Sequence, residues 1–254
     1  MYEIGILGGM GPRATAMLFQ QIVDSTPAHT DQEHLNIAMV SKSKIPDRSA
    51  YLLGQSAESP LPALLEGIRE LDNLGAKVIL LPCNTAHHFY SQLADSSQGY
   101  VLNMVRNALH YISASDLPKK VYVLGTLGTV KTQIYDRNNH YGLSICYPND
   151  ASCRKLHRII YEVKEQNAAL SELARDLDAV IEEIRQEMGQ VTFAVACTEL
   201  SCLFPFLQKK DGVVDVMDLS ALAAVSLFDI VPISAENYDV SVLCAVAKED
   251  FRGK

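Results

Sequence analysis

The chain contains no run of apolar residues that approaches the roughly 18 needed to cross a lipid bilayer. It also has no Gly/Ser, Gln or Pro tract that would indicate a disordered segment, and its hydrophobic content of 48% is typical of a globular protein. Residues 1–5 lead into an apolar segment without the basic region, apolar core and cleavage site of a leader. We therefore expect a fully folded cytoplasmic protein that does not insert into membranes.

Positive charge is scarce, since 22 Lys and Arg residues stand against 30 Asp and Glu residues, for a net charge of −8. Nucleic-acid backbones attract basic surfaces, so this charge argues against a nucleic-acid partner. The six cysteines include no Cys-x-x-Cys pair and no Cys/His cluster at zinc-ligand spacing, so we expect reduced thiols and no metal site. The net charge also means that an acidic ligand would need a locally cationic pocket.

Short, continuous apolar segments alternate with helical patterns along the chain. Such segments are typical of parallel strands that are covered by helices on both faces. We predict strands at residues 4–7, 35–40, 77–82, 121–125, 142–147, 192–197 and 213–217. The clearest helix is predicted over residues 60–74, where Gly75 supplies a C-terminal stop, and Pro12 suits the first turn of another. The alternation of strand and helix predicts an α/β fold.

An internal repeat relates the two halves of the chain. Residues 6–15 align with residues 123–132 at an offset of 117, and each segment contains a Gly-x-x-Gly turn between a strand and a helix. Residues 78–85 align with residues 192–199 at an offset of 114, so each half ends a strand at a cysteine. Two matches in the same order predict two similar Rossmann-like parallel-sheet domains that are related by a pseudo-two-fold axis.

The predicted domains place the two repeated cysteines on opposite walls of one cleft. We expect residues 1–116 with residues 211–254 to form the first domain, which carries Cys83, and residues 117–210 to form the second, which carries Cys197. Ligands of open α/β sheets bind beyond the carboxyl ends of the strands, where both cysteines fall. The active site is therefore expected in the interdomain cleft.

Two thiols that face each other suit the inversion of a carbon that carries one hydrogen. One group must remove a proton from one face and the other must deliver a proton to the opposite face, which a thiolate and a thiol can do. A free cysteine has a pKa of about 8.5, so the surroundings must favour the thiolate. Asn84-Thr85 and Thr198-Glu199 are predicted to open helices whose N–H groups and dipoles do so. The cysteines that have no counterpart in the repeat are interpreted as small buried hydrophobic residues: Cys146, Cys153, Cys202 and Cys244.

Five motifs are spaced along most of the chain: GILGGMGPRAT (5–15), IPDRSAY (45–51), PCNTAH (82–87), VKEQN (163–167) and ACTEL (196–200). Together they resemble the aspartate racemase branch of the aspartate/glutamate racemase superfamily. The resemblance implies racemization of a small acidic amino acid, aspartate first and glutamate next, without pyridoxal phosphate or another cofactor. It implies Cys83 and Cys197 as the alternating acid and base, and a homodimer.

The resemblance also implies a set of substrate-binding residues. Arg48 and Lys164 match basic residues near the substrate carboxylates and would supply the cationic pocket that an acidic ligand needs. The other positions that match the lining of the site are Met10, Asn84, Thr85 and Thr198. Glu199 could polarise or orient Cys197, or it could stabilise a helix end through the dipole alone. His87 could return to the Cys83 thiol on a helix, although a surface histidine is the commoner case.

Departures from related branches narrow the function. The glutamate racemases of cell-wall synthesis have Asp-Ser-Gly and Cys-Thr-His where this chain has Gly8-Gly9-Met10 and Cys197-Thr198-Glu199, so that sub-branch is disfavoured. Two other functions stay open: a lyase or cis-trans isomerase of the superfamily that uses one cysteine, and a two-lobed amino-acid binding protein without catalysis. Retention of both cysteines favours racemization. Residues 238–254 could form a packed element, a subunit contact or a cap on the first domain.

Overall fold

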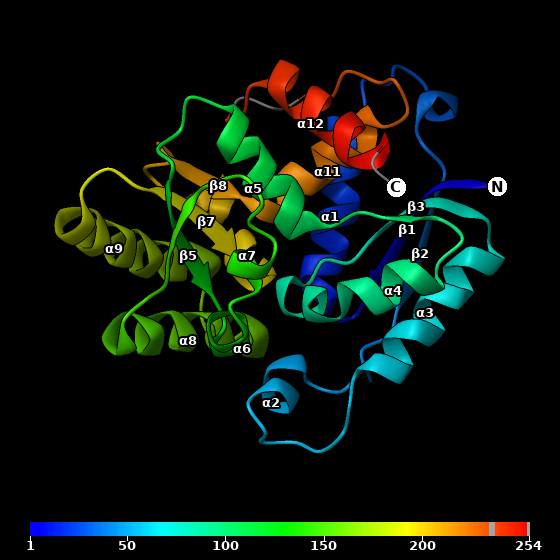
Figure 1. Cartoon of the computed structure of the whole chain (residues 1–254). Coiled ribbons are helices and arrows are strands. Elements are labelled where there is room, and N and C mark those ends of the chain that lie inside the picture. The colour runs from blue at the N-terminus through cyan, green and yellow to red at the C-terminus, as the bar shows by residue number, and fades with distance from the viewer. Residues whose placement is uncertain (234–236, 253–254) are drawn as a thin grey trace.

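The computed structural model describes residues 1–233 and 237–252 of the chain. Its strands form two four-stranded sheets, and every strand pair in them is parallel (Figure 1). The α/β class and the two similar parallel-sheet halves predicted from the internal repeat are therefore confirmed.

The first half of the chain folds around one of these sheets. Its elements, in which η marks a 3-10 helix, are β1 (Tyr2–Gly8), α1 (Pro12–Ser25), η1 (Asp31–Glu33), β2 (Ile37–Ser41), α2 (Arg48–Leu52), α3 (Leu61–Asn73), β3 (Ala76–Leu80), η2 (Asn84–Phe89), α4 (Tyr90–Ser96), β4 (Tyr100–Val101) and α5 (Met104–Ala114). Helix α3 matches the predicted helix, and Pro12 opens α1 because its missing N–H has no partner in a first turn. Strand β4 was not predicted, because two residues are too few for a strand pattern.

The second half repeats this arrangement. Its elements are β5 (Lys120–Gly125), α6 (Leu127–Thr132), α7 (Ile134–Arg137), β6 (Ser144–Cys146), α8 (Asp150–Glu165), α9 (Leu170–Met188), β7 (Thr192–Ala196), α10 (Thr198–Ser201), η3 (Phe204–Phe206), β8 (Val213–Asp215), α11 (Val216–Ser226) and α12 (Val240–Arg252). The strand orders are β2-β1-β3-β4 and β6-β5-β7-β8, so each strand of the first sheet has a counterpart at the same place in the second. The cysteine-bearing turns consequently follow equivalent strands, β3 and β7.

Helix α11 joins the two halves. It follows β8 of the second sheet but packs against α1 and α5 of the first half, and it lies between the sheets in Figure 1. Nearly every residue of α11 is buried, and a helix that is apolar all round belongs in the interior of a protein. One hydrophobic core therefore runs through both halves, and a smaller core forms around Ile68 and Leu71 of α3.

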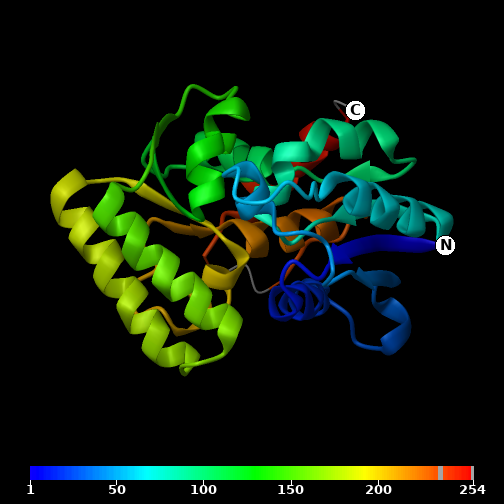
Figure 2. The same ribbon diagram turned by 90° about the horizontal axis from the view of Figure 1, so that it is seen from below.

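The outer helices complete the molecule. Helices α8 and α9 lie side by side at the edge of the second half (Figure 2), and the short helix α2 projects from the first half and contacts α6. Helix α12 packs against α5 and α11, so the C-terminal segment forms a packed element. Predictions for residues 234–236 and 253–254 lie outside the described residues. Within the described ranges, no helix is both long and apolar enough to cross a membrane.

The division of the chain into domains stays a prediction, but β8 bears on one of its boundaries. Residues 213–215 were expected in the first domain, whereas β8 pairs with β7 in the second sheet. Helices α11 and α12, which follow β8, pack against the first half. We therefore propose that the chain returns to the first domain after Asp215 rather than after residue 210.

Two carboxyl groups, the buried Asp215 and the half-buried Asp218, lie at the start of α11. Asp215 is fully buried, and its Oδ1 accepts hydrogen bonds from the backbone N–H of Met217 at 3.0 Å and from the hydroxyl of Ser201 at 2.6 Å. Burial raises the pKa of Asp215, and burial together with the charge of Asp215 raises the pKa of Asp218. Both carboxyl groups therefore hold their protons at a higher pH in the folded state than in the unfolded chain.

The Asp218→Asn variant is expected to be more stable than the parent at pH 8 by about 1–2 kcal/mol. The unfolded chain releases the proton near pH 4 and the folded chain releases it later, so stability falls as the pH rises from about 4 towards the folded-state pKa. Urea unfolding should show the gain at pH 8 and little gain at pH 4. Asp31→Asn, at an exposed position of η1, is the control. An equal gain for Asp218→Asn at both pH values would contradict the prediction.

Candidate active site

The two repeated cysteines lie at equivalent ends of the two sheets. Cys197 directly follows β7, and Cys83 follows β3 after two intervening residues. Each is the N-cap of a short helix and has an extended backbone, Cys83 before η2 and Cys197 before α10. Both side chains are buried, and all six cysteines are free thiols.

Both cysteines line one pocket between the halves, which encloses about 300 Å³ of space, part of it open to solvent. The predicted site residues that line it are Met10, Arg48, Cys83, Asn84, Thr85, Lys164, Cys197, Thr198 and Glu199. The lining residues that were not predicted are Asp47, Ser49, Thr126 and Ala196. Thr126 and Ala196 stand at the ends of β5 and β7, so the preference of ligands for the carboxyl ends of strands could have indicated them.

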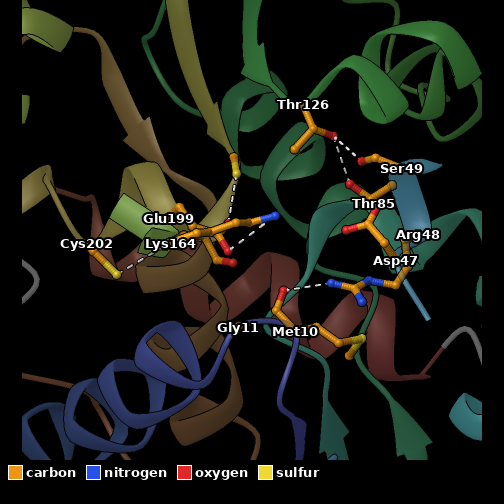
Figure 3. Close-up of polar contacts among 12 residues, drawn as sticks. Met10, Gly11, Asp47, Arg48, Ser49, Thr85, Thr126, Lys164, Glu199 and Cys202 are labelled. Carbon is orange, nitrogen blue, oxygen red and sulfur yellow. Dashed lines mark hydrogen bonds and ion pairs between the residues drawn. The ribbon is translucent and has the colours of Figure 1, made fainter. Parts of the chain in front are cut away.

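A carboxylate and an ammonium group lie beside Cys197. Its Sγ donates a hydrogen bond to Glu199 Oε2 at 3.0 Å, and Lys164 Nζ lies 4.0 Å from Glu199 Oε1. Figure 3 shows the Lys164 and Glu199 side chains next to each other, on the opposite side of the site from Arg48 and Asp47. Burial lowers the pKa of Lys164, but the charges of Glu199, Cys197 and Asp47 more than offset this and raise it overall. Lys164 therefore stays cationic at neutral pH.

The expectation that a helix N-terminus favours a thiolate is wrong for Cys197. Burial, followed by the charge of Glu199, raises the pKa of the Cys197 thiol well above its ordinary value, and Lys164 offsets only part of this effect. Helix α10 has only four residues, so its dipole is small. Cys197 is therefore a protonated thiol at neutral pH, which is the form that delivers a proton.

Most of the Arg48 guanidinium group is bound to the backbone. Its Nη1 donates to the carbonyl oxygens of Ile45 at 3.2 Å and Pro46 at 3.1 Å, and its Nη2 donates to the Met10 carbonyl at 3.1 Å. Arg48 is only 8% exposed, and it ties the loop before α2 to the glycine turn after β1 (Figure 3). Its contact with a substrate carboxylate, which the resemblance implies, stays a prediction.

The residue after each cysteine forms a hydrogen bond with the other half. Asn84 Oδ1 accepts a hydrogen bond from the hydroxyl of Tyr135 in α7 at 2.8 Å. Thr198 Oγ1, which follows the cysteine of the second half, donates to the carbonyl of Pro82 in the first half at 3.2 Å. The Thr198 bond joins the two cysteine turns, and the Asn84 bond joins the Cys83 turn to α7.

Hydroxyl groups join the halves at a second place. Thr85 Oγ1 lies 3.0 Å from Thr126 Oγ1, which also accepts a hydrogen bond from Ser49 Oγ at 3.3 Å (Figure 3). Gly128, in α6, makes this approach possible, because a Cβ at its position would lie 3.0 Å from the Ser49 Cα. The second glycine of the repeated turn therefore lets α2 pack against the second half.

Three buried polar atoms of the pocket residues have no hydrogen-bond partner within residues 1–233 and 237–252. They are the donors Arg48 Nε and Asn84 Nδ2 and the acceptor Glu199 Oε1. Buried polar groups are usually hydrogen-bonded, so unpartnered groups in a pocket mark positions where a ligand would supply the missing partners. Two donors and one carboxylate oxygen suit a molecule that carries both a carboxylate and an ammonium group.

His87 is buried rather than exposed on a helix surface, and it does not line the pocket. Its Nδ1 lies 3.0 Å from the Cys83 carbonyl oxygen, and its Nε2 lies 3.3 Å from the Met104 backbone nitrogen and 3.4 Å from the Leu102 carbonyl oxygen. Burial lowers the pKa of His87, so the ring is neutral at neutral pH. His87 supports the Cys83 backbone from behind.

The pocket opens into a larger cavity of about 1050 Å³, part of it open to solvent, between the start of α1 and the end of α8. Both spaces are lined by Met10, Asp47, Arg48, Lys164 and Glu199. In the part of the chain that the structure describes, no three His, Cys, Asp or Glu side chains are placed to hold a metal ion. The smaller pocket itself is lined by two thiols, two carboxyl groups and two basic side chains.

Comparison with known proteins agrees with this geometry. The chain is 25% identical over 233 residues to the broad specificity amino-acid racemase RacX of Bacillus subtilis. This alignment covers 89% of this chain and 97% of RacX. The structure is similar to Picrophilus torridus aspartate racemase, with a TM-score of 0.79, 25% identity and coverage of 95% of this chain and 99% of the other. An aspartate racemase homologue from Pyrococcus horikoshii has a TM-score of 0.70 at 20% identity, with coverage of 90% and 100%.

A family model also matches most of the chain. The model described as Asp/Glu/hydantoin racemase matches residues 7–226, a span that includes both repeated cysteines and every residue that lines the pocket. Because the match covers most of the chain, the protein belongs to the Asp/Glu/hydantoin racemase family.

Proposed function

We propose that the protein racemizes an acidic amino acid, aspartate first and glutamate next, by a cofactor-independent mechanism that uses two thiols. The observation that carries the proposal is the placement of Cys83 and Cys197 at equivalent strand ends on one pocket, beside two donors and one carboxyl oxygen that have no hydrogen-bond partner among the described residues. Racemase relatives that align along nearly the whole chain, RacX and the Picrophilus aspartate racemase, support an amino-acid racemase.

The proton transfers follow from the protonation state of Cys197. In one direction the Cys83 thiolate removes the α-proton, and the Cys197 thiol delivers its proton to the opposite face of the carbanion. The products are the mirror-image amino acid, a Cys83 thiol and a Cys197 thiolate. The reverse reaction uses the same groups with exchanged roles. One proton leaves and one arrives, so the thiols suffice and no further acid or base is required.

The unpartnered atoms suggest how the substrate is held. Asn84 Nδ2 and Arg48 Nε would donate to a carboxylate, and Glu199 Oε1 would accept from the ammonium group. Lys164, a compact cation on the rim between the pocket and the larger cavity, would bind the side-chain carboxylate of aspartate or glutamate. An extra methylene changes binding by only about 1–3 kcal/mol, so both acids are reasonable substrates.

Racemization in heavy water tests the proposal. Incubation of L-aspartate with the protein in D₂O should yield D-aspartate that carries deuterium at the α-carbon, without release of carbon dioxide. Decarboxylation or alkene isomerization would instead show a one-cysteine enzyme of the superfamily. Binding of aspartate without turnover would show a non-catalytic binding protein. A panel of L- and D-amino acids then ranks the substrates, and sedimentation velocity tests the predicted homodimer.

The Glu199→Gln variant is expected to lose about tenfold in kcat/KM for aspartate racemization, equally in both directions because the equilibrium constant is one. Removal of the negative charge lowers the pKa of the Cys197 thiol. The loss of activity at alkaline pH, where Cys197 gives up the proton it must deliver, should therefore begin at a lower pH. pH profiles of kcat/KM measure this, with the exposed Glu172→Gln as the control. An unchanged alkaline limb would refute the role of Glu199.

A further inference from the structure

The Tyr135 side chain is fully buried, and its hydroxyl donates a hydrogen bond to Asn84 Oδ1 at 2.8 Å. The other end of the same amide, Asn84 Nδ2, is buried without a partner among the described residues, and Asn84 lines the pocket. We propose that Tyr135 is a positioning residue: it orients the Asn84 amide so that Nδ2, not Oδ1, faces a substrate carboxylate. The inference rests on the proposed function for the identity of that substrate.

The hydroxyl of Tyr135 selects one orientation of the amide. Burial raises the pKa of Tyr135 well above its ordinary value, so the phenol keeps its proton and needs an acceptor. Within the described ranges its only hydrogen bond is the one to Asn84 Oδ1. A flipped amide would leave the buried O–H group without an acceptor and would turn a carbonyl oxygen towards the substrate carboxylate. Both effects oppose the flip, since a buried unsatisfied donor is destabilising.

The backbone around α7 places the tyrosine for this task. Gln133 adopts a left-handed conformation with φ of 49°, which ends α6 and starts α7 in a new direction. Few non-glycine residues adopt such angles, so the break must be held by the surrounding structure. Helix α7 then contacts η2, which begins with Asn84, from the other half of the molecule.

The internal repeat indicates that this device exists on one side of the pocket only. At the offset of 117, Tyr135 corresponds to Leu18, an apolar residue buried in the core of the first half. The counterpart of Asn84 is Thr198, whose own hydroxyl donates to the Pro82 carbonyl. An asparagine amide carries an acceptor oxygen and a donor nitrogen that exchange places when the amide flips. A threonine hydroxyl is a single group that can both donate and accept, so no such flip exists. A dedicated hydroxyl partner is therefore needed beside Cys83 but not beside Cys197.

Steady-state kinetics with a double-mutant cycle test the functional half of this inference. Tyr135→Phe should raise the KM for aspartate about tenfold and change kcat by less than about threefold. If Tyr135 acts through Asn84, the same substitution in an Asn84→Ala background should change KM by less than about twofold, because the two effects are not additive. Tyr111→Phe is the matched control, since Tyr111 is also buried and its hydroxyl accepts a hydrogen bond from the Asp239 N–H at 2.8 Å, away from the pocket. Equal losses in both backgrounds would overturn the proposal.

A measurement without substrate separates this inference from the proposed function. The side-chain amide resonances of Asn84, identified by their loss in Asn84→Ala, should be single and sharp in the parent. They should broaden or double in Tyr135→Phe and stay unchanged in Tyr111→Phe. Unchanged Asn84 resonances in Tyr135→Phe would refute the positioning role even if the protein is a racemase. If the parent shows no racemization but the resonances respond, the positioning role holds and the proposed function fails.

Discussion

Replacement of either Cys83 or Cys197 by serine is expected to lower kcat/KM for aspartate racemization by at least about 10³-fold. A hydroxyl is a far weaker acid than a thiol. The serine therefore neither forms the alkoxide that would remove the α-proton nor delivers a proton to the opposite face as the thiol does. Each variant keeps one working thiol on one face of the substrate. Cys197→Ser keeps Cys83 and should still exchange the α-proton of one enantiomer with solvent. Cys83→Ser keeps only Cys197, which is protonated at neutral pH, and should exchange the α-proton of the opposite enantiomer only as the pH rises.

Chiral chromatography measures the racemization, and proton NMR in D₂O measures the exchange. Cys244→Ser, which alters a partly buried cysteine of α12, should keep parental activity and controls for the loss of a thiol as such. Activity that survives in one of the two site variants would indicate a one-cysteine mechanism. Activity that survives in both would remove the thiols from the mechanism altogether.

Replacement of Gly9 by alanine is expected to destabilise the protein by about 3 kcal/mol or more and to abolish activity. Gly9 has φ of 94°, and a Cβ there would lie 2.4 Å from the Lys42 carbonyl carbon and 2.6 Å from the Lys42 nitrogen. Backbone atoms cannot move aside as a flexible side chain can. The glycine turn would therefore shift, and with it the Met10 carbonyl that holds Arg48.

Gly54→Ala separates strain in the backbone from the clash with Lys42. Gly54 also has a positive φ, of 73°, but a Cβ at its position would meet no atom within 4 Å. Its substitution should cost only about 1 kcal/mol, the conformational part of the effect. Urea unfolding of both variants gives the comparison. Similar losses for the two would show that the close approach to Lys42 contributes little.

The architecture was accessible from sequence because its evidence is local and repeated. Apolar runs, glycine turns and the cysteine at each strand end are patterns within a few residues, and their recurrence at offsets of 117 and 114 required no knowledge of contacts. The two sheets have the strand order that such a repeat implies. The short strand β4 was not predicted, because its two residues take their conformation from pairing with β3.

The inner geometry of the site was less accessible. His87 was expected on a helix surface or beside the thiol, and instead it is buried with its ring against backbone groups of Cys83, Leu102 and Met104. The environment expected to favour a thiolate at Cys197 instead keeps it protonated, because burial and Glu199 outweigh a short helix. Burial and charge at one atom depend on side chains that come from several elements, so no local pattern reports them.

The order of residues along this chain was enough to predict an α/β fold with two related halves, a pair of equivalent cysteines and most of the residues that line the pocket with them. The packing of the halves against each other established which atoms of those residues remain free for a ligand. Arg48 is mostly bound to backbone carbonyls, and Asn84 is held by Tyr135, a residue 51 positions away. The physical reason is that a hydrogen bond depends on distance and direction between groups, and between the two halves those are set only when the whole core has folded.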